Sequence, residues 1–398
     1  MILSAIHERQ LKKLMKNARA IAFYLPQYHA TPENDRWWGR GFTEWTNVTR
    51  AEPLFRGHDQ PKIPADLGFY DLRVPETRVA QAELARQNGI EAFCYWHYWF
   101  AGKRLLERPF NEVLKSGEPD FSFCLAWANE SWTGVWQGEP SRILMEQTYP
   151  GDDDYVRHFQ ALENAFGDDR YIKIDGRPLF IVYRPESLPE PQRFTDLWNS
   201  LAVKAGLLGI YFIGILEQPW SEVGGFDGYT YHLPGTFLQT LPPRIIKRMK
   251  RKLSDRSLDR YIPGRSRTPL TVAYQALMKR ALRTMPFGPR HYPSVLPNWD
   301  STPRHGRKGL VLTDSSPAAF REHLREALTI IRDREPNHRL IFLKSWNEWA
   351  EGNYLEPDLR FGSGYLEALR DELINAPVAD ANVSLDRFGD AVPVDLTA

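Results

Sequence analysis

The chain has 398 residues, of which 42% are hydrophobic and 25% charged, and its formal net charge is +1 at pH 7. This composition is ordinary for a globular protein, and the near-neutral charge excludes a general attraction to nucleic acid. The two cysteines, Cys94 and Cys124, are too few for a disulfide framework or a cysteine-based metal site. Thirteen tryptophans and seventeen tyrosines are the unusual feature.

The first residues carry no signal for export. Residues 1–20 include Lys12, Lys13, Lys16 and Arg19 but no continuous apolar stretch, and no run in the chain is long enough to cross a bilayer. We therefore expect a cytoplasmic protein, in which residues 1–19 form a helical lead-in.

Eight apolar runs predict strands along the rest of the chain. They cover Ala20–Tyr28, Ile90–Trp96, Phe121–Trp127, Leu179–Tyr183, Ile210–Leu216, Gly228–His232, Ser294–Pro297 and Leu340–Lys344. Several are followed by helical patterns, namely Pro75–Asn88, Asp153–Phe166, Phe194–Ala205 and Pro317–Asp333. Strands that alternate with helices indicate a parallel sheet. Eight of them, without a glycine-rich nucleotide-binding turn after the first, favour a (β/α)8 TIM barrel over residues 20–375.

Two insertions make the chain longer than a plain barrel. Thr31–Leu72 is rich in Trp, Gly and Pro and is expected to form an ordered loop over the barrel mouth. Residues 233–292 include the basic segment Arg244–Arg256, which can form an amphipathic helix. That helix would either be solvated or contact an anionic membrane surface or saccharide. Residues 376–398 show no periodicity and are expected to form an irregular tail.

Polar and aromatic residues recur where the predicted strands end. In a TIM barrel these ends meet at one face, where the active site lies. The strand-end residues expected to touch a substrate are Tyr28, His29, Trp96, His97, Trp127, Asn129, Glu130, Tyr183, Trp299 and Asp300, with Glu44 added from the first insertion. His29 and His97 are equally well explained as buried wall residues, and Glu44, Asn129 and Glu130 as rim residues without a ligand.

The last predicted strand leads into the stretch Trp346-Asn347-Glu348-Trp349-Ala350-Glu351-Gly352. Two carboxylates three residues apart in a sheltered place cannot both ionise freely, so one pKa should rise and the other stay low. Glycoside cleavage needs such a pair. Aromatic rings beside acids also suit sugars, and Trp346, Trp349, Tyr354 and Asn347 are further candidate contacts. The alternative is that both acids cap a solvent-exposed loop.

These stretches together resemble the WbsX-type proteins. The motifs that carry the resemblance are FYLPQYH (23–29), WWGRGFTEWTNV (37–48), YWHYWF (95–100), WANESWT (127–133), WD (299–300) and WNEWAEG (346–352). WbsX-type proteins are usually found in polysaccharide and O-antigen gene clusters and have been labelled glycosyltransferases. They are similar to glycoside hydrolase family 99, the endo-α-mannosidases and endomannanases, which are (β/α)8 barrels.

The resemblance implies roles for the two glutamates. The family 99 motif Asn-Glu-Trp-His-Glu-Gly falls on residues 347–352. In those hydrolases the first Glu, here Glu348, is proposed to act as base on the sugar 2-hydroxyl, giving a 1,2-anhydro sugar. The second, here Glu351, protonates the leaving oxygen and then deprotonates water, with net retention. Ala350 stands where family 99 usually has His, which puts the mannose preference in doubt.

The expected function is therefore an enzyme, without cofactor or metal, that cleaves or transglycosylates a bacterial surface polysaccharide or its precursor, such as that of lipopolysaccharide. One alternative is a glycosyltransferase of polysaccharide assembly. Asp152-Asp153-Asp154 satisfies the Asp-x-Asp pattern of many such enzymes, but it precedes a predicted helix, where acids interact with free backbone N–H groups. No phosphate-binding glycine motif accompanies it. Another alternative is a carbohydrate-binding barrel without catalysis.

Overall fold

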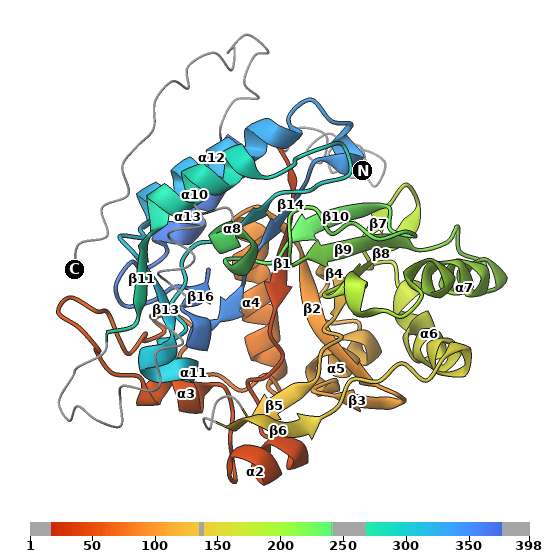
Figure 1. The fold of residues 1–398 in the computed structure, drawn as a ribbon, viewed down its shortest axis with the longest axis horizontal. Coiled ribbons are helices and arrows are strands. Elements are labelled where there is room, and N and C mark those ends of the chain that lie inside the picture. The colour runs from red at the N-terminus through yellow and green to blue at the C-terminus, as the bar shows by residue number, and fades with distance from the viewer. Residues whose placement is uncertain (1–16, 135–138, 240, 242–267, 376–398) are drawn as a thin grey trace, which may run out of the picture.

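The computed structural model describes residues 17–134, 139–239, 241 and 268–375, and its centre is a barrel of eight parallel strands (Figure 1). Neighbouring strands pair in the order β10-β9-β8-β4-β2-β1-β14-β12, so the last strands of the chain lie beside the first. In chain order the strands are β1 (Arg19–Tyr24), β2 (Ile90–Phe100), β4 (Ser122–Trp127), β8 (Arg177–Val182), β9 (Tyr211–Leu216), β10 (Gly228–Tyr231), β12 (Ser294–Val295) and β14 (Leu340–Leu343). All eight predicted strands are confirmed.

The barrel is closed between β10 and the segment that leads into β12. The backbone of Tyr229 donates to Arg290 O and accepts from Tyr292 N, each at 2.8 Å. Beside them the hydroxyl groups of Thr230 and Ser294 lie 2.7 Å apart. These contacts replace the ladder that β12, with only two residues, is too short to form. The predicted TIM barrel is therefore confirmed.

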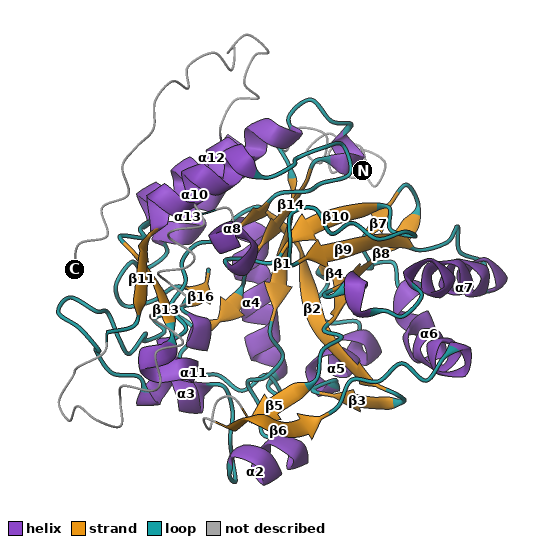
Figure 2. Cartoon of the chain, viewed as in Figure 1, coloured by secondary structure: helices purple, strands orange, loops and turns teal. Residues whose placement is uncertain are grey.

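Helices cover the outside of the barrel (Figure 2). They are α4 (Pro75–Gln87), α5 (Arg108–Ser116), α6 (Asp152–Phe166), α7 (Pro191–Lys204), α8 (Gly235–Gln239), α10 (Tyr274–Thr284), α12 (Pro317–Ile331) and α13 (Gly364–Arg370). The four predicted helices correspond to α4, α6, α7 and α12. The connection from β9 to β10, residues 217–227, contains no helix.

Part of the predicted insertion 233–292 forms a small separate sheet and a helix that packs beside the barrel. β11 (Leu270–Ala273) pairs with β13 (Leu310–Thr313), and α10 packs against α12 through the rings of Tyr274 and His323, 6.2 Å apart. The predicted lead-in over residues 1–16, the basic segment Arg244–Arg256 and the tail 376–398 lie outside the described residues.

The first insertion and an unpredicted hairpin lie at the strand ends. The insertion contains α2 (Pro32–Trp38) and α3 (Trp45–Arg50), and the hairpin consists of β5 (Trp132–Gly134) and β6 (Glu139–Met145). Both lie at the same edge of the molecule in Figure 1. Within the residues that the structure describes, no helix is long and apolar enough to cross a membrane.

Candidate active site

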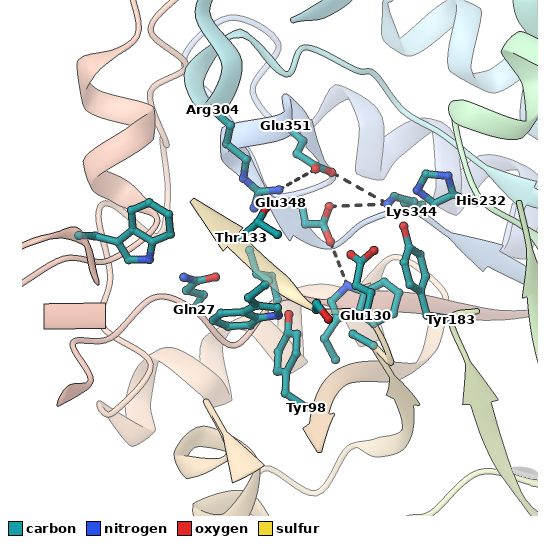
Figure 3. Close-up of a pocket in the computed structure, with 16 residues that line it drawn as sticks. Gln27, Tyr98, Glu130, Thr133, Tyr183, His232, Arg304, Lys344, Glu348 and Glu351 are labelled. Carbon is teal, nitrogen blue, oxygen red and sulfur yellow. Dashed lines mark hydrogen bonds and ion pairs between the residues drawn. The ribbon is translucent and has the colours of Figure 1, made fainter. Parts of the chain in front are cut away.

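A cavity of ≈ 360 Å³ opens at the carboxyl ends of the barrel strands (Figure 3). Its wall combines aromatic rings with charged and amide side chains, the mixture that is typical of small-molecule sites. The lining residues are Leu25, Gln27, Trp38, Trp96, Tyr98, Ala128, Glu130, Ser131, Trp132, Thr133, Tyr183, His232, Arg304, Lys344, Glu348 and Glu351.

The loop after β14 brings both glutamates into this cavity. Glu348 ends the short strand β15 (Asn347–Glu348), and Glu351 ends the 3-10 turn that follows, Trp349–Glu351. Gly352 then adopts φ +58°, and a Cβ there would lie 2.9 Å from the backbone nitrogen of Asp300. Only glycine permits this approach, which allows Asp300 N to donate to Glu351 O at 2.6 Å. The backbone around Glu351 is thus held against the loop after β12.

Lys344, the residue after β14, lies between the two acids. Its Nζ is 3.8 Å from Glu348 Oε2 and 4.0 Å from Glu351 Oε2 (Figure 3). The same ammonium lies 5.3 Å from the ring centroid of Trp299, a cation–π distance. Trp96 Nε1 donates to Glu348 Oε1 at 2.9 Å. Lys344 therefore contacts both acids from the barrel side, and Trp96 holds Glu348 there as well.

Arg304 binds Glu351 from the opposite side. Its Nη1 donates to Glu351 Oε1 at 2.6 Å, and its Nε donates to Glu44 Oε1 at 2.8 Å. Glu44, from the first insertion, is fully buried. Arg304 lies on the short helix α11 (Thr302–His305), whose start is fixed by bonds from Thr302 N and Oγ1 to Asp300 at 3.0 and 2.6 Å. The first insertion thus positions the Arg304 guanidinium beside Glu351 through Glu44.

The surroundings separate the pKa values of the two acids. Burial raises the pKa of Glu348 to about 7, more than Lys344 lowers it. Burial would also raise the pKa of Glu351, but Arg304 and Lys344 hold it below the ordinary value. The negative charge of Glu351 beside it raises the pKa of Glu348 further. When the pair holds one proton, that proton therefore favours Glu348 over Glu351.

This proton predicts how stability depends on pH. Because the folded pKa of Glu348 is raised from 4.5 to about 7, its contribution to stability is complete below about pH 4.5 and is lost as the pH rises through 7. We expect the free energy of unfolding in urea to fall between about pH 5 and about pH 8, and to fall less in Glu348→Gln. Burial also raises the pKa of Glu356 to about 7. That residue is unchanged in both proteins, so an equal fall in the two would contradict the proton on Glu348.

Residues 20–369 match the family described as Glycosyltransferase WbsX. The chain belongs to the WbsX family. It is 39% identical over 365 residues to an uncharacterized protein WxcX of Xanthomonas campestris pv. campestris (strain B100). The match covers 90% of this chain but 50% of that protein, so the chain spans about half the length of this curated relative. The resemblance inferred from the motifs is confirmed.

Solved structures share the fold of this WbsX chain at low sequence identity. One described as a glycoside hydrolase-like protein has a TM-score of 0.53 and 14% identity, covering 89% of this chain and 94% of its own. A GH99 endo-alpha-mannosidase of Bacteroides thetaiotaomicron, solved with BIS-TRIS-Propane, has a TM-score of 0.52 and 15% identity, covering 88% and 95%. These similarities show the barrel fold.

Five of the predicted site residues line the cavity of the WbsX chain: Trp96, Glu130, Tyr183, Glu348 and Glu351. Trp299, Glu44 and Asp300 do not line it, but they contact Lys344, Arg304 and the backbone of Glu351 respectively. The structure therefore brings these eight residues to one place.

Another group of predicted contacts is buried beneath the site instead. Asn347 binds the backbone of Leu25 through both amide atoms, at 2.7 and 3.1 Å. Trp349 stacks on Tyr354 with ring centroids 3.7 Å apart. The remaining members, Tyr28 and Trp346, are also buried outside the cavity lining. The turn after β14 directs the two glutamates into the cavity and the rings of Trp346, Trp349 and Tyr354 into the core, and none of the five residues lines the cavity.

Four strand-end residues also form barrel wall. His97 bonds the buried His158, with ring nitrogens 2.8 Å apart, and Trp127 donates to Trp99 O at 3.2 Å. Asn129 ties its loop to Arg184 through both amide atoms, at 2.9 and 2.8 Å. His29 is buried and does not line the cavity. None of the four lies on the cavity surface.

Sequence reasoning missed the cations of the site. Lys344 was visible as a lysine that directly follows an apolar strand, four residues before Glu348, where a buried charge needs a partner. Arg304 lies in a polar stretch, and no pattern distinguished it. Tyr98, His232 and the hairpin residues were also absent from the predicted set.

The Asp-x-Asp pattern lies in the first turn of α6, as predicted. Asp154 accepts from Trp99 Nε1 at 3.0 Å and from Arg157, and Asp152 pairs with Arg193 at 2.8 Å. Neither aspartate lines the cavity.

Proposed function

We propose that this chain is an enzyme that cleaves, or transfers between, glycosidic bonds of a bacterial surface polysaccharide or its precursor. The observation that carries the proposal is the pair Glu348 and Glu351, buried at the barrel mouth on either side of Lys344 Nζ, at 3.8 and 4.0 Å, with pKa values shifted in opposite directions. Two carboxylates with separated pKa values are the machinery for glycoside hydrolysis. The aromatic wall of the cavity suits the apolar faces of sugar rings.

The roles follow those implied by the resemblance to family 99. Glu348 removes the proton of the sugar 2-hydroxyl, O2 attacks C1, and the bond from C1 to the leaving oxygen breaks while Glu351 protonates that oxygen. Glu351 then deprotonates a water that attacks C1. The bond from C1 to O2 breaks and O2 regains its proton from Glu348. Both acids end in the state in which they began.

In the free enzyme the proton favours Glu348, whereas the proposed mechanism needs it on Glu351 when the leaving oxygen is protonated. Arg304 and Lys344 favour an ionised Glu351, so the proton rests on Glu348. Catalysis in these roles requires that the proton moves from Glu348 to Glu351. Because the whole pair carries one proton in both arrangements, the shift needs no outside acid or base.

The experiment that tests this function compares two readouts. Release of reducing ends from a panel of bacterial and mannose-containing glycans is expected for a hydrolase. Binding of nucleoside diphosphate sugars, measured by calorimetry, would instead support a glycosyltransferase. Glycan binding with neither activity would support a non-catalytic barrel and contradict the proposal.

The short spacing of the acids predicts the stereochemistry. Inverting enzymes keep their carboxyl groups about 6.5–9.5 Å apart to hold a water between them. Glu348 and Glu351 instead are three residues apart, and both lie within 4.0 Å of the same Lys344 Nζ. We expect the anomer first released, followed by NMR, to keep the configuration of the substrate. Release of the opposite anomer would exclude the 1,2-anhydro sugar intermediate.

A further inference from the structure

The cavity has two levels of aromatic residues along β2. Trp96 and Tyr98 are two residues apart and both line the cavity, as expected for alternating side chains of one strand. A strand rises about 3.3 Å per residue, so Tyr98 lies roughly 7 Å nearer the open end of the barrel. Trp96 is at the level of the catalytic pair because its Nε1 donates to Glu348.

The inner level surrounds the two acids. Tyr183 packs edge-on against Trp96, with centroids 5.6 Å apart, and against His232 at 5.3 Å. We call Trp96, Tyr183 and His232 the inner tier. All three line the cavity together with Glu348 and Glu351. The inner tier lines the place that a sugar ring occupies when its C1 faces the two carboxyl groups.

The outer level is built by Trp132 of β5 above Tyr98. The indole of Trp132 meets Tyr98 at 5.0 Å with planes 83° apart, and Phe100 at 6.1 Å and 84°. It also contacts Trp37 of α2 at 5.8 Å. These contacts fix the orientation of Trp132, which is only partly buried although it lines the cavity. Among the described residues, no parallel ring stacks on it.

Trp38 lines the cavity from a separate insertion, and its neighbour Trp37 contacts Trp132. Trp38 ends α2, packs on Phe42 with centroids 5.8 Å apart, and is partly buried at the cavity wall. We call Tyr98, Trp132 and Trp38 the outer tier. Ser131, Thr133 and Gln27 line the same cavity and supply hydroxyl and amide groups beside these rings. Partly exposed tryptophans with neighbouring hydrogen-bonding groups match a sugar, which has apolar ring faces and a polar edge.

We propose that the outer tier binds a second sugar ring of the substrate, next to the ring held at the Glu348–Glu351 pair. The inference rests on the proposed function, since it assigns the inner tier to the reacting sugar. It specifies the ligand as an oligosaccharide of at least two rings. It also gives a role to α2 and the β5–β6 hairpin, which lie outside the barrel and reach the cavity through Trp38 and Trp132.

The test measures binding without turnover, in the Glu351→Gln background. Calorimetry is done with methyl α-D-mannopyranoside, α-mannobiose and α-mannotriose, and with the corresponding glucosides. We expect affinity to rise about tenfold or more from one ring to two, since a good aromatic contact contributes on the order of 1 kcal/mol. Trp132→Leu and Trp38→Leu should each lose most of this gain while keeping the affinity for the single ring.

Two controls make the result specific. Trp220→Leu replaces a tryptophan that is 72% exposed and outside the cavity lining, and should change nothing. Trp132→Leu also loses packing against three rings, so Trp38→Leu tests the tier from a different element, with thermal unfolding measured on all variants.

The outcomes separate this inference from the proposed function. A gain for the second ring that survives both outer-tier substitutions overturns the inference alone. A gain that depends on Trp132 and Trp38, in a wild-type enzyme that cleaves no glycan, supports the inference and contradicts the proposed function. Failure of every sugar in both series to bind overturns both.

Discussion

Glu351→Gln is expected to slow cleavage of a natural sugar–sugar bond by roughly 10²–10⁴-fold, the usual loss when general acid–base help is removed. The effect should be much smaller in the first step on an aryl glycoside, because a phenolate leaves without being protonated. Glu348 acts on the sugar itself in the proposed mechanism. Glu348→Gln should therefore be equally slow on both substrates, when initial rates are compared at matched enzyme concentrations.

The opposite result has a clear meaning. If the aryl glycoside rescues Glu348→Gln instead, then Glu348 is the general acid that protonates the leaving oxygen. The proton would then act from the residue that holds it in the free enzyme, and the roles of Glu348 and Glu351 would be exchanged. Glu335→Gln, which changes an exposed glutamate outside the cavity, is the matched control and should keep normal rates. Mild and equal losses in both site variants would exclude glycosidase chemistry at this pair.

Arg304→Met is expected to lower the free energy of unfolding by about 3–5 kcal/mol, because it leaves a buried charge without its partner. Arg304 bridges Glu44, whose side chain is 0% exposed, and Glu351, at 2.8 and 2.6 Å. Without the guanidinium, the side-chain bond that Glu44 retains within the described part of the chain comes from Asn47 Nδ2, at 3.2 Å on the same carboxylate oxygen. Urea unfolding near neutral pH measures the change.

The double variant Arg304→Met with Glu44→Gln provides the decisive comparison. Removing the stranded carboxylate should restore part of the loss, so the two substitutions should not be additive. Arg193→Met is the exposed control, since Arg193 also bridges two acids, Asp152 and Glu190, but at the surface, where a pair contributes about 0–1 kcal/mol. Equal losses of unfolding free energy in Arg304→Met and Arg193→Met would show that the buried bridge stabilises the fold no more than the exposed one.

Most of the barrel could be predicted because its strands are buried on both faces and read as continuous apolar runs. β1, β4 and β14 are such runs, and each was recognised close to its observed bounds. The elements that were missed are short or formed by tertiary contact. The β5–β6 hairpin has register shifts next to both Trp132 and Thr133, so it lacks a regular alternation of apolar and polar residues.

The site could be predicted only at the level of its acids. A strand end predicts which residues reach the mouth of the barrel, but not which of two adjacent side chains turns inward. Trp346 and Trp349 lie in the core, whereas Glu348 and Glu351 line the cavity. The cations came from elsewhere, because Arg304 meets Glu44 across 260 positions of sequence. A contact of that range leaves no local pattern.

The pairing of β14 with β1 has a consequence for the order of events during synthesis. Ala20 lies beside Ile90 of β2 on one side and Ile341 of β14 on the other, so β1 gains its second neighbour only after about 320 further residues have been made. Lys344, Glu348 and Glu351 emerge only with that late neighbour, whereas Glu44 is made near the start. The carboxylate of Glu44 is therefore made long before the acids and the lysine that complete the centre. The centre is complete only once β14 has docked beside β1.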